Sequence, residues 1–291
     1  MHVPFGISSL TLVAALVLAL PLYLLIALYF YAPFKVRSNQ TKEVHVNFFP
    51  IELPNLPHDI HDSFVAASQS LAALGFQSIG TACRHLAKTN QDSFISIWVN
   101  QSHNDSAQVI AIRTPSPLGG LQIVTLVTYH TDFSDDTAVV TSNSASASVF
   151  PRDPTTDAIR CSHVRDLSLL YSFHRARVAR DQRGRRATLE KTKDVVARML
   201  FEHEQTYDRL MQTGYYALDG SREYYVPTLK GAFFMTWKLL PPFKQIQKYR
   251  KDRLADRMLQ ELGFGGMEAF YQMQAASPPN AGVIQYSGGT R

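Results

Sequence analysis

Residues 94–99 read Phe94-Ile95-Ser96-Ile97-Trp98-Val99, a β-branched and aromatic run that is typical of a buried β-strand. Four further stretches carry strand signals, at residues 76–86, 108–112, 121–129 and 137–142. The turn-rich segments between them are too short for the helices that connect parallel strands. The sequence therefore predicts an antiparallel β-meander of four or five strands.

Segments with helical periodicity precede and follow this meander in the sequence. Before it, apolar residues recur at helical spacing up to Gly75, with Asp59 or Asp62 as the cap. After Pro151, helices are predicted at 164–178, 188–211, 229–240 and 243–263, with a small hairpin at 215–226. The expected class is α+β, a sheet covered by helices on one face and followed by a basic helical C-terminal region.

Residues 8–32 carry no charged side chain and consist mainly of Leu, Ala, Val, Ile, Phe and Tyr. A helix of this length spans about 37 Å, more than the ~30 Å hydrocarbon core of a bilayer. Tyr29, Tyr31 and Phe34 gather at its end, as in the aromatic belts of membrane helices. We therefore expect one membrane-spanning anchor that contains Pro21.

A cleaved signal peptide is the competing interpretation of this segment. No Lys or Arg precedes the apolar run, which lacks an Ala-x-Ala triplet and exceeds the usual length of about 7–15 residues. Lys35, Arg37 and Lys42 follow it, so the positive-inside rule places the C-terminal body in the cytoplasm. An uncleaved, single-pass signal-anchor is the favoured arrangement.

The remaining chain divides by its proline and periodicity patterns. After an anchor region at 1–32, four prolines predict an extended stalk at 33–57. Three regions are expected to follow: an α+β domain at 58–186, a helical region with the small hairpin at 187–274, and a disordered tail at 275–291.

Composition indicates a chain with a packed core and an uneven charge. Of 291 residues, 45% are hydrophobic, and the formal net charge is +5. Residues 33–150 hold 6 Lys/Arg against 9 Asp/Glu, whereas residues 151–291 hold 23 against 15. Cys83 and Cys161 form no CxxC pair, so two free thiols are favoured over one long-range disulfide, and the pairing stays open.

Two short strings contain the residue types of chemical sites. His58-Asp59-Ile60-His61-Asp62 places two histidines on one helix face, but a metal would need further ligands from elsewhere. A polar helix start is favoured, and no metal site is predicted. Tyr129-His130-Thr131-Asp132, followed by Asp135-Asp136, fits a solvated turn between strands better than an acid/base cluster.

The common catalytic fingerprints are missing from the sequence. No G-x-S-x-G nucleophile motif, P-loop or G-x-G-x-x-G dinucleotide motif occurs. The commonest hydrolase and nucleotide-binding classes are therefore disfavoured, and neither a catalytic residue nor a cofactor is predicted.

Two basic runs are candidate membrane-surface contacts. The first comprises Arg175, Arg177, Arg180, Arg183, Arg185 and Arg186, and the second includes Lys244, Lys248, Arg250 and Lys251. An anchored chain meets lipid headgroups first, so anionic lipid is a better expected partner than nucleic acid. The apolar block at 231–237 adds to this interpretation, and a solvated charged face is the alternative.

Three functions remain open from the sequence. The favoured one is a non-enzymatic, single-pass protein whose body binds a partner protein, or a second copy of itself, and stabilises a complex at the membrane surface. The second is a sensor of a small ligand or lipid headgroup. The third is a metal-assisted enzyme that uses His58 and His61.

Overall fold

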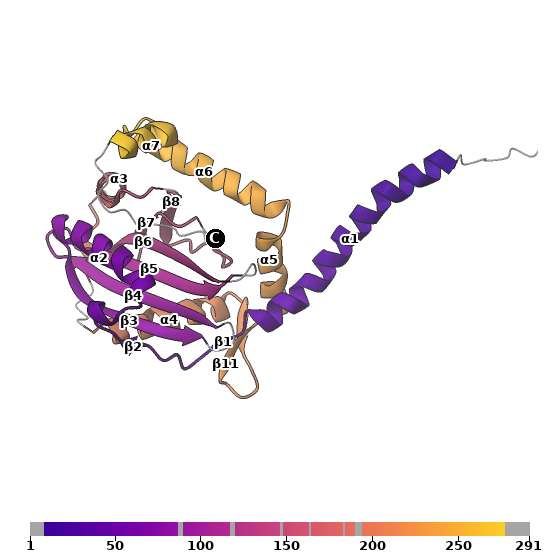
Figure 1. Ribbon diagram of the computed structural model, residues 1–291, viewed down its shortest axis with the longest axis horizontal. Helices are drawn as coiled ribbons and strands as arrows, with labels where there is room; N and C mark the ends of the chain where they lie inside the picture. The colour runs from indigo at the N-terminus through magenta and orange to yellow at the C-terminus, as the bar shows by residue number, and fades with distance from the viewer. Residues whose placement is uncertain are drawn as a thin grey trace, which may run out of the picture. The chain divides into compact units, whose positions relative to one another are not determined.

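The computed structural model describes residues 9–86, 90–116, 120–145, 148–162, 164–182, 184–189 and 194–276 (Figure 1). The chain divides into two compact units, each made of two segments. The sheet unit comprises Val46–His203 and Ile246–Arg291, and the anchor unit comprises Met1–His45 and Glu204–Gln245. Helices α4 (Val195–Gln212) and α6 (Phe243–Glu261) cross the division.

The sheet unit is built on an eight-stranded sheet. Its main path runs through β2 (Phe49–Pro50), β3 (Gln77–Leu86), β4 (Gln91–Asn100), β5 (Asp105–Pro115), β6 (Leu121–Phe133), β7 (Ala138–Ser142) and β8 (Thr156–Arg160). The short β9 (Ala187–Thr188) pairs with β6. Neighbouring strands from β2 to β7 are antiparallel, and β8 joins β7 in parallel. The predicted α+β class with an antiparallel meander is confirmed.

Alternation along the strands gives the sheet two apolar faces. On β4, Phe94 and Trp98 belong to the main core, whereas Ile95 and Ile97 belong to a separate cluster with α4. Because side chains of a strand point alternately to opposite faces, this separation follows from the sequence of the strand itself.

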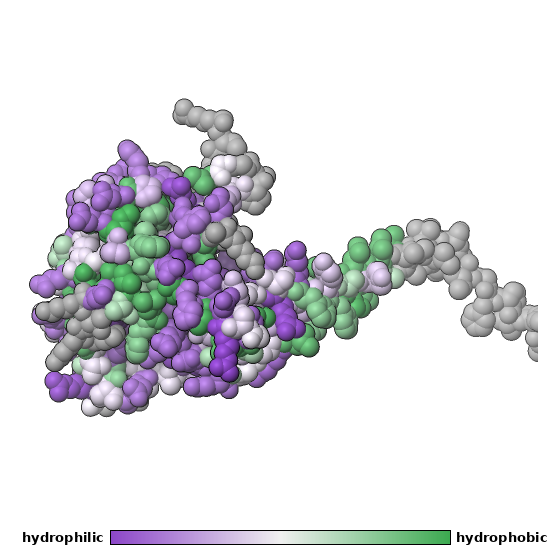
Figure 2. Space-filling model, turned by 90° about the horizontal axis from the view of Figure 1, so that it is seen from below, coloured by the Kyte–Doolittle hydropathy of each residue, from purple (hydrophilic) through white to green (hydrophobic). Residues whose placement is uncertain are grey.

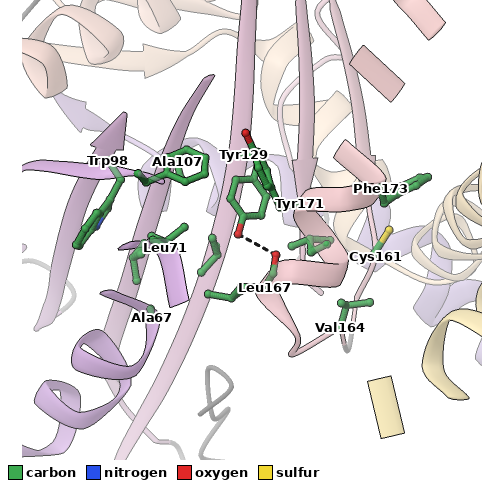
Figure 3. Packing of buried hydrophobic residues seen from close by; sticks show 14 of the residues in the cluster. Ala67, Leu71, Trp98, Ala107, Tyr129, Cys161, Val164, Leu167, Tyr171 and Phe173 are labelled. Carbon is green, nitrogen blue, oxygen red and sulfur yellow. Dashed lines mark hydrogen bonds between the residues drawn. The ribbon is translucent and has the colours of Figure 1, made fainter. Parts of the chain in front are cut away.

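The main core lies between one sheet face and four helical segments (Figure 3). These are α2 (His58–Ala73), α3 (Leu167–Asp181), α7 (Gly266–Ala276) and the last part of α6.

Gly75, at a φ of +83°, ends the α2 segment as predicted, because glycine adopts the left-handed conformation without strain. In Figure 3 the Tyr129 hydroxyl points to α3, where it donates to the carbonyl of Leu167 over 3.0 Å.

The second sheet face is also covered in part, which corrects the expectation of helices on one face alone. Val195 and Met199 of α4 pack on Ala82 and Ile97. The physical reason is the apolar character of β4 on both faces, since a water-facing Ile95 and Ile97 would lose the free energy of burial.

The anchor unit joins α1 (Ser9–Asn39) to a three-stranded sheet and α5 (Leu229–Leu239). The sheet order is β1 (Lys42–Glu43), β11 (Tyr224–Pro227), β10 (Tyr216–Leu218), so the hairpin predicted across Asp219-Gly220 forms. In the described chain, Ala19–Asn39 is the helix with the length and composition to cross a membrane. Figure 2 shows hydrophobic side chains along it.

Helix α1 extends beyond Pro33, where the sequence predicted an extended stalk. Proline removes one backbone donor from a helix, and here only the carbonyl four residues earlier, at Tyr29, loses its partner. The side chain of Pro33 is buried, so packing offsets that loss. The non-helical segment starts after Asn39 and contains β1, β2 and the 3-10 turn η1 (Leu53–Asn55).

Candidate functional site

An open groove lies between the sheet edge and the start of α4 in the sheet unit. Its volume is about 510 Å³, and its lining residues are Pro50, Ile51, Glu52, Ile79, Gly80, Thr81, Asp194 and Val195. Strand β2 pairs with Ala82 and Cys83, and the N–H of Ile51 donates to the carbonyl of Thr81 over 2.9 Å, so among the described residues the edge of β3 at Ile79 and Gly80 borders the groove. Unpaired strand edges accept an added strand from another chain. The groove therefore has the geometry to take an extended peptide segment.

Two carboxylates give this groove a negative character. Glu52 and Asp194 are both exposed. Asp194 is held in place because its side chain accepts the backbone N–H groups of Val196 and Ala197 at 2.8 and 3.4 Å, as the cap of α4. A basic side chain on the bound segment would find complementary charge here.

The hydroxyl of Thr81, which lines the groove, is used within the fold. The hydroxyl of Thr81 donates to Ser96 Oγ over 3.1 Å, and the indole N–H of Trp98 donates to the same oxygen over 2.9 Å. The Ser96 hydroxyl donates in turn to the carbonyl of Gly80. The hydroxyl of Thr81 is therefore bonded within the fold and is not activated as a nucleophile.

A second polar cluster is buried between α3 and strands β5 to β7. The Asp105 side chain is fully buried and accepts hydrogen bonds from Thr131 Oγ1 at 2.6 Å and Tyr171 Oη at 2.7 Å. Arg175 Nη1 lies 3.1 and 3.0 Å from its two oxygens. The buried charge of Asp105 is therefore both paired and hydrogen-bonded, as burial requires.

His174 lies at the centre of this cluster with its tautomer fixed by its partners. Arg177 donates to Thr141 Oγ1 over 2.6 Å, so the Thr141 hydroxyl is free to donate to His174 Nδ1 at 2.9 Å. Thr131 donates to Asp105 and so accepts from His174 Nε2, also at 2.9 Å. Burial, with the charges of Arg177, His130 and Arg175, holds the pKa of His174 well below 6.5. The imidazole is therefore neutral.

Arg177 lies at the end of the cluster opposite Asp105. Its side chain is fully buried and donates to the carbonyls of Val140 and Asp157, at 2.7 and 2.8 Å, and to the Asp157 carboxylate at 2.8 Å. A directional chain of donors thus runs from Arg177 through Thr141, His174 and Thr131 to Asp105. It fastens α3 to three strands, and its central groups have no exposed surface for a substrate.

Most arginines of the first basic run have hydrogen-bond or ion-pair partners within the fold, and Arg177 is buried. Arg175 and Arg177 belong to the buried cluster, and Arg180 pairs with Asp181 at 2.9 Å. Arg185 donates to Thr137 and stacks over Phe133 at 4.4 Å. Arg186 is exposed, and Arg183 lies outside the described residues.

The second basic run lies on α6 and is more open. Lys244, Lys248 and Arg250 are exposed, whereas Lys251 is half-buried. Burial lowers the pKa of Lys251, and the charge of Arg160 adds to that effect. Among the described residues, this run has three exposed cations, whereas the first run has Arg186.

The histidine string at the start of α2 is polar and local. His61 Nδ1 lies 3.2 Å from Asp62, and Asp59 lies 3.6 Å from Arg113. Across the part of the chain that the structure describes, no three His, Cys, Asp or Glu side chains gather closely enough to hold a metal ion. The geometry gives no support to metal chemistry at His58 and His61.

The string at residues 129–132 lies within β6, and the turn follows it at Ser134 to Asp136. Tyr129 and Thr131 are buried, whereas His130 points to the other face, 3.3 Å from Asp132. The interpretation as a solvated turn was wrong for Tyr129 and Thr131, because alternation along the strand carries both side chains into the interior.

Cys83 and Cys161 are both free thiols. Cys161 is buried, which raises the pKa of its thiol to about 12. A thiol in this state is a poor nucleophile, because the thiolate is the reactive form.

The Asp105–His174–Arg177 cluster was not predicted from the sequence. His174 and Arg177 lie three residues apart on α3, but Asp105, Thr131 and Thr141 come from strands more than 30 residues earlier, so no local spacing motif links them. The available signal was a histidine on the apolar face of a helix, which requires a polar partner inside the core. In comparisons with known proteins, no family model, no curated protein and no solved structure matches the chain.

Proposed function

We propose that this chain is a single-pass membrane-anchored protein whose body binds a partner protein at the membrane surface, without catalysing a reaction. The observation that carries the proposal is α1. Its residues Leu20, Tyr23 and Phe30 are 57%, 67% and 67% exposed. Exposed apolar area costs roughly 25 cal/mol per Å² in water, and a bilayer removes that cost.

Flanking charge supports a cytoplasmic body. Lys35, Arg37 and Lys42 follow the apolar part of α1 and keep their side of the helix inside the cell under the positive-inside rule.

The groove beside Glu52 and Asp194 is the proposed partner site. It combines an open strand edge with two exposed carboxylates, which suits an extended segment with a basic side chain. The buried acid/base groups described above are already bonded within the fold, which supports binding rather than catalysis. The exposed cations of α6 support anionic lipid as an additional contact.

A matched pair of charge reversals tests this site in the full chain. After mild detergent extraction, the wild type and Glu223→Lys, which changes an exposed residue of the anchor unit, are expected to co-purify with a partner of fixed stoichiometry. Glu52→Lys is expected to lose most of that partner, because the new charge repels a basic segment.

Light scattering of the purified material separates the outcomes. A second copy of the chain as the partner would appear as a dimer of twice the 32.7 kDa mass. Recovery of monomer alone from the wild type would overturn the proposal of a stable partner. Equal recovery with Glu52→Lys and wild type would overturn the groove as its site.

A further inference from the structure

Helix α5 has two unlike faces. Gly231, Ala232, Met235 and Thr236 are buried, and Thr228 caps the helix by accepting the N–H of Gly231 over 3.1 Å. The opposite stripe contains Leu229, Phe233 and Trp237, which follow each other at intervals of four residues and are 50%, 39% and 54% exposed. On a helix this spacing aligns the three side chains. The outward face of α5 is therefore apolar, where a water-facing helix carries polar residues.

The buried face of α5 packs against the last turns of α1, and Figure 1 shows the two helices side by side there. Tyr29, Ala32, Pro33 and Val36 lie at helical spacing and are the less exposed positions of this part of α1. The Tyr29 hydroxyl donates to the carbonyl of Pro241 over 2.5 Å. The position of α5 along α1 is thus set by specific contacts.

A series of aromatic ring contacts connects α1 with the outward apolar stripe of α5. Tyr29 meets Phe243 edge-on with ring centroids 6.3 Å apart, and Phe243 stacks on Trp237 at 5.1 Å. Tyr29 lies six residues, or about 9 Å of helix, before Lys35. This is the level where the hydrocarbon core gives way to headgroups, and where Tyr and Trp concentrate in membrane proteins.

Lysines frame the same surface. Lys230 Nζ lies 4.7 Å from the centre of the Tyr215 ring, and Lys238 Nζ lies 4.5 Å from that of Phe234. The aliphatic part of each lysine side chain lies beside an aromatic ring, and its ammonium group lies at the far end. Such side chains are typical of a surface that contacts both acyl chains and headgroup phosphates.

We propose that α5 and the turn to Phe243 lie in the headgroup region of the membrane that α1 crosses, with Leu229, Phe233 and Trp237 in contact with lipid. The proposal rests on the proposed membrane anchoring. The apolar stripe of α5 adjoins the part of α1 that lies near the membrane interface, and for this reason we assign lipid as its occupant. The anchor is then a pair of helices, one that spans the membrane and one that lies at its surface.

The two tryptophans of the chain make this testable. Trp98 is 6% exposed in the core, and Trp237 is 54% exposed on α5. The full chain is reconstituted in vesicles of phosphatidylcholine and phosphatidylserine, with or without lipids brominated near the carbonyl end of the acyl chain. Bromine quenches only nearby tryptophans, so it reports whether Trp237 lies at the interface.

The matched variants are Trp98→Phe, which leaves Trp237 alone, and Trp237→Phe, which leaves Trp98 alone. Trp98→Phe is expected to lose most of its emission in brominated vesicles, and Trp237→Phe to lose little. Flotation of the same vesicles separates two failures. A chain that does not float contradicts the anchor itself. If the chain floats but Trp237 is not quenched by bromine and is quenched by aqueous iodide, the proposed position of α5 is overturned. The membrane anchor is not contradicted by that result.

Discussion

At the scale of single residues, the buried chain from Arg177 to Asp105 sets the behaviour of His174. Each hydroxyl in it donates in one direction only, with a guanidinium at one end and a carboxylate at the other. A proton on His174 Nδ1 would remove the acceptor of the Thr141 hydroxyl and add a cation beside Arg177 and Arg175. The native state therefore excludes that proton.

This exclusion makes the stability of the sheet unit depend on pH. In the unfolded chain the histidine binds a proton below about pH 6.5, whereas in the native state its pKa is held well below that value. The unfolded state then binds more protons, so the free energy of unfolding falls as pH drops below 6.5. The slope from this group approaches about 1.4 kcal/mol per pH unit.

Urea unfolding at several pH values measures this contribution. His174→Gln is expected to be less stable at neutral pH and to show a flatter fall below pH 6.5. His61→Gln, which changes a partly exposed histidine of α2 outside this cluster, is the matched control. Equal slopes in wild type and His174→Gln would contradict the assignment.

At the scale of elements, the strongest patterns predicted the structure best. Strands β4, β5 and β6, the hairpin at β10–β11 and helix α5 follow from alternation, the Asp219-Gly220 turn and an apolar run that ends at Pro241. Strand β8 was missed, because its five residues gain their stability from parallel pairing with β7 and not from local pattern. The start of α4 was predicted too early for a similar reason, as residues 187–188 pair with β6.

Gly231 shows how one position fixes the packing of an element. A Cβ atom there would lie 2.0 Å from the carbonyl oxygen of Tyr215, so only glycine lets α5 approach the hairpin. Gly231→Ala is expected to destabilise the anchor unit by at least about 1–3 kcal/mol, the usual cost of overpacking.

Limited proteolysis of the full chain in detergent measures this effect. Gly231→Ala is expected to speed cleavage within the β10–β11 hairpin. Gly220→Ala is the matched control, because a Cβ at that turn position meets nothing within 4 Å. Similar cleavage rates for both variants would refute the close approach of α5 and the hairpin.

At the scale of the whole molecule, charge and hydropathy along the chain predicted the apolar N-terminal helix but not the candidate sites. The groove depends on where α4 meets the edge of β3, and the buried cluster joins residues from four elements. Such sites arise from tertiary packing, so neither composition nor local spacing contains them. The basic run at 175–186 illustrates this: its pattern suggested a charged surface, whereas Arg177 is wholly buried.

We expect α1 to hold the intact chain in a membrane as an uncleaved anchor. Alkaline carbonate extraction of membranes from expressing cells, followed by intact-mass analysis of the pellet, tests it most directly. An anchored chain is expected to stay in the pellet with a mass of 32.7 kDa. Release into the supernatant, or a mass reduced by the loss of an N-terminal leader, would contradict it.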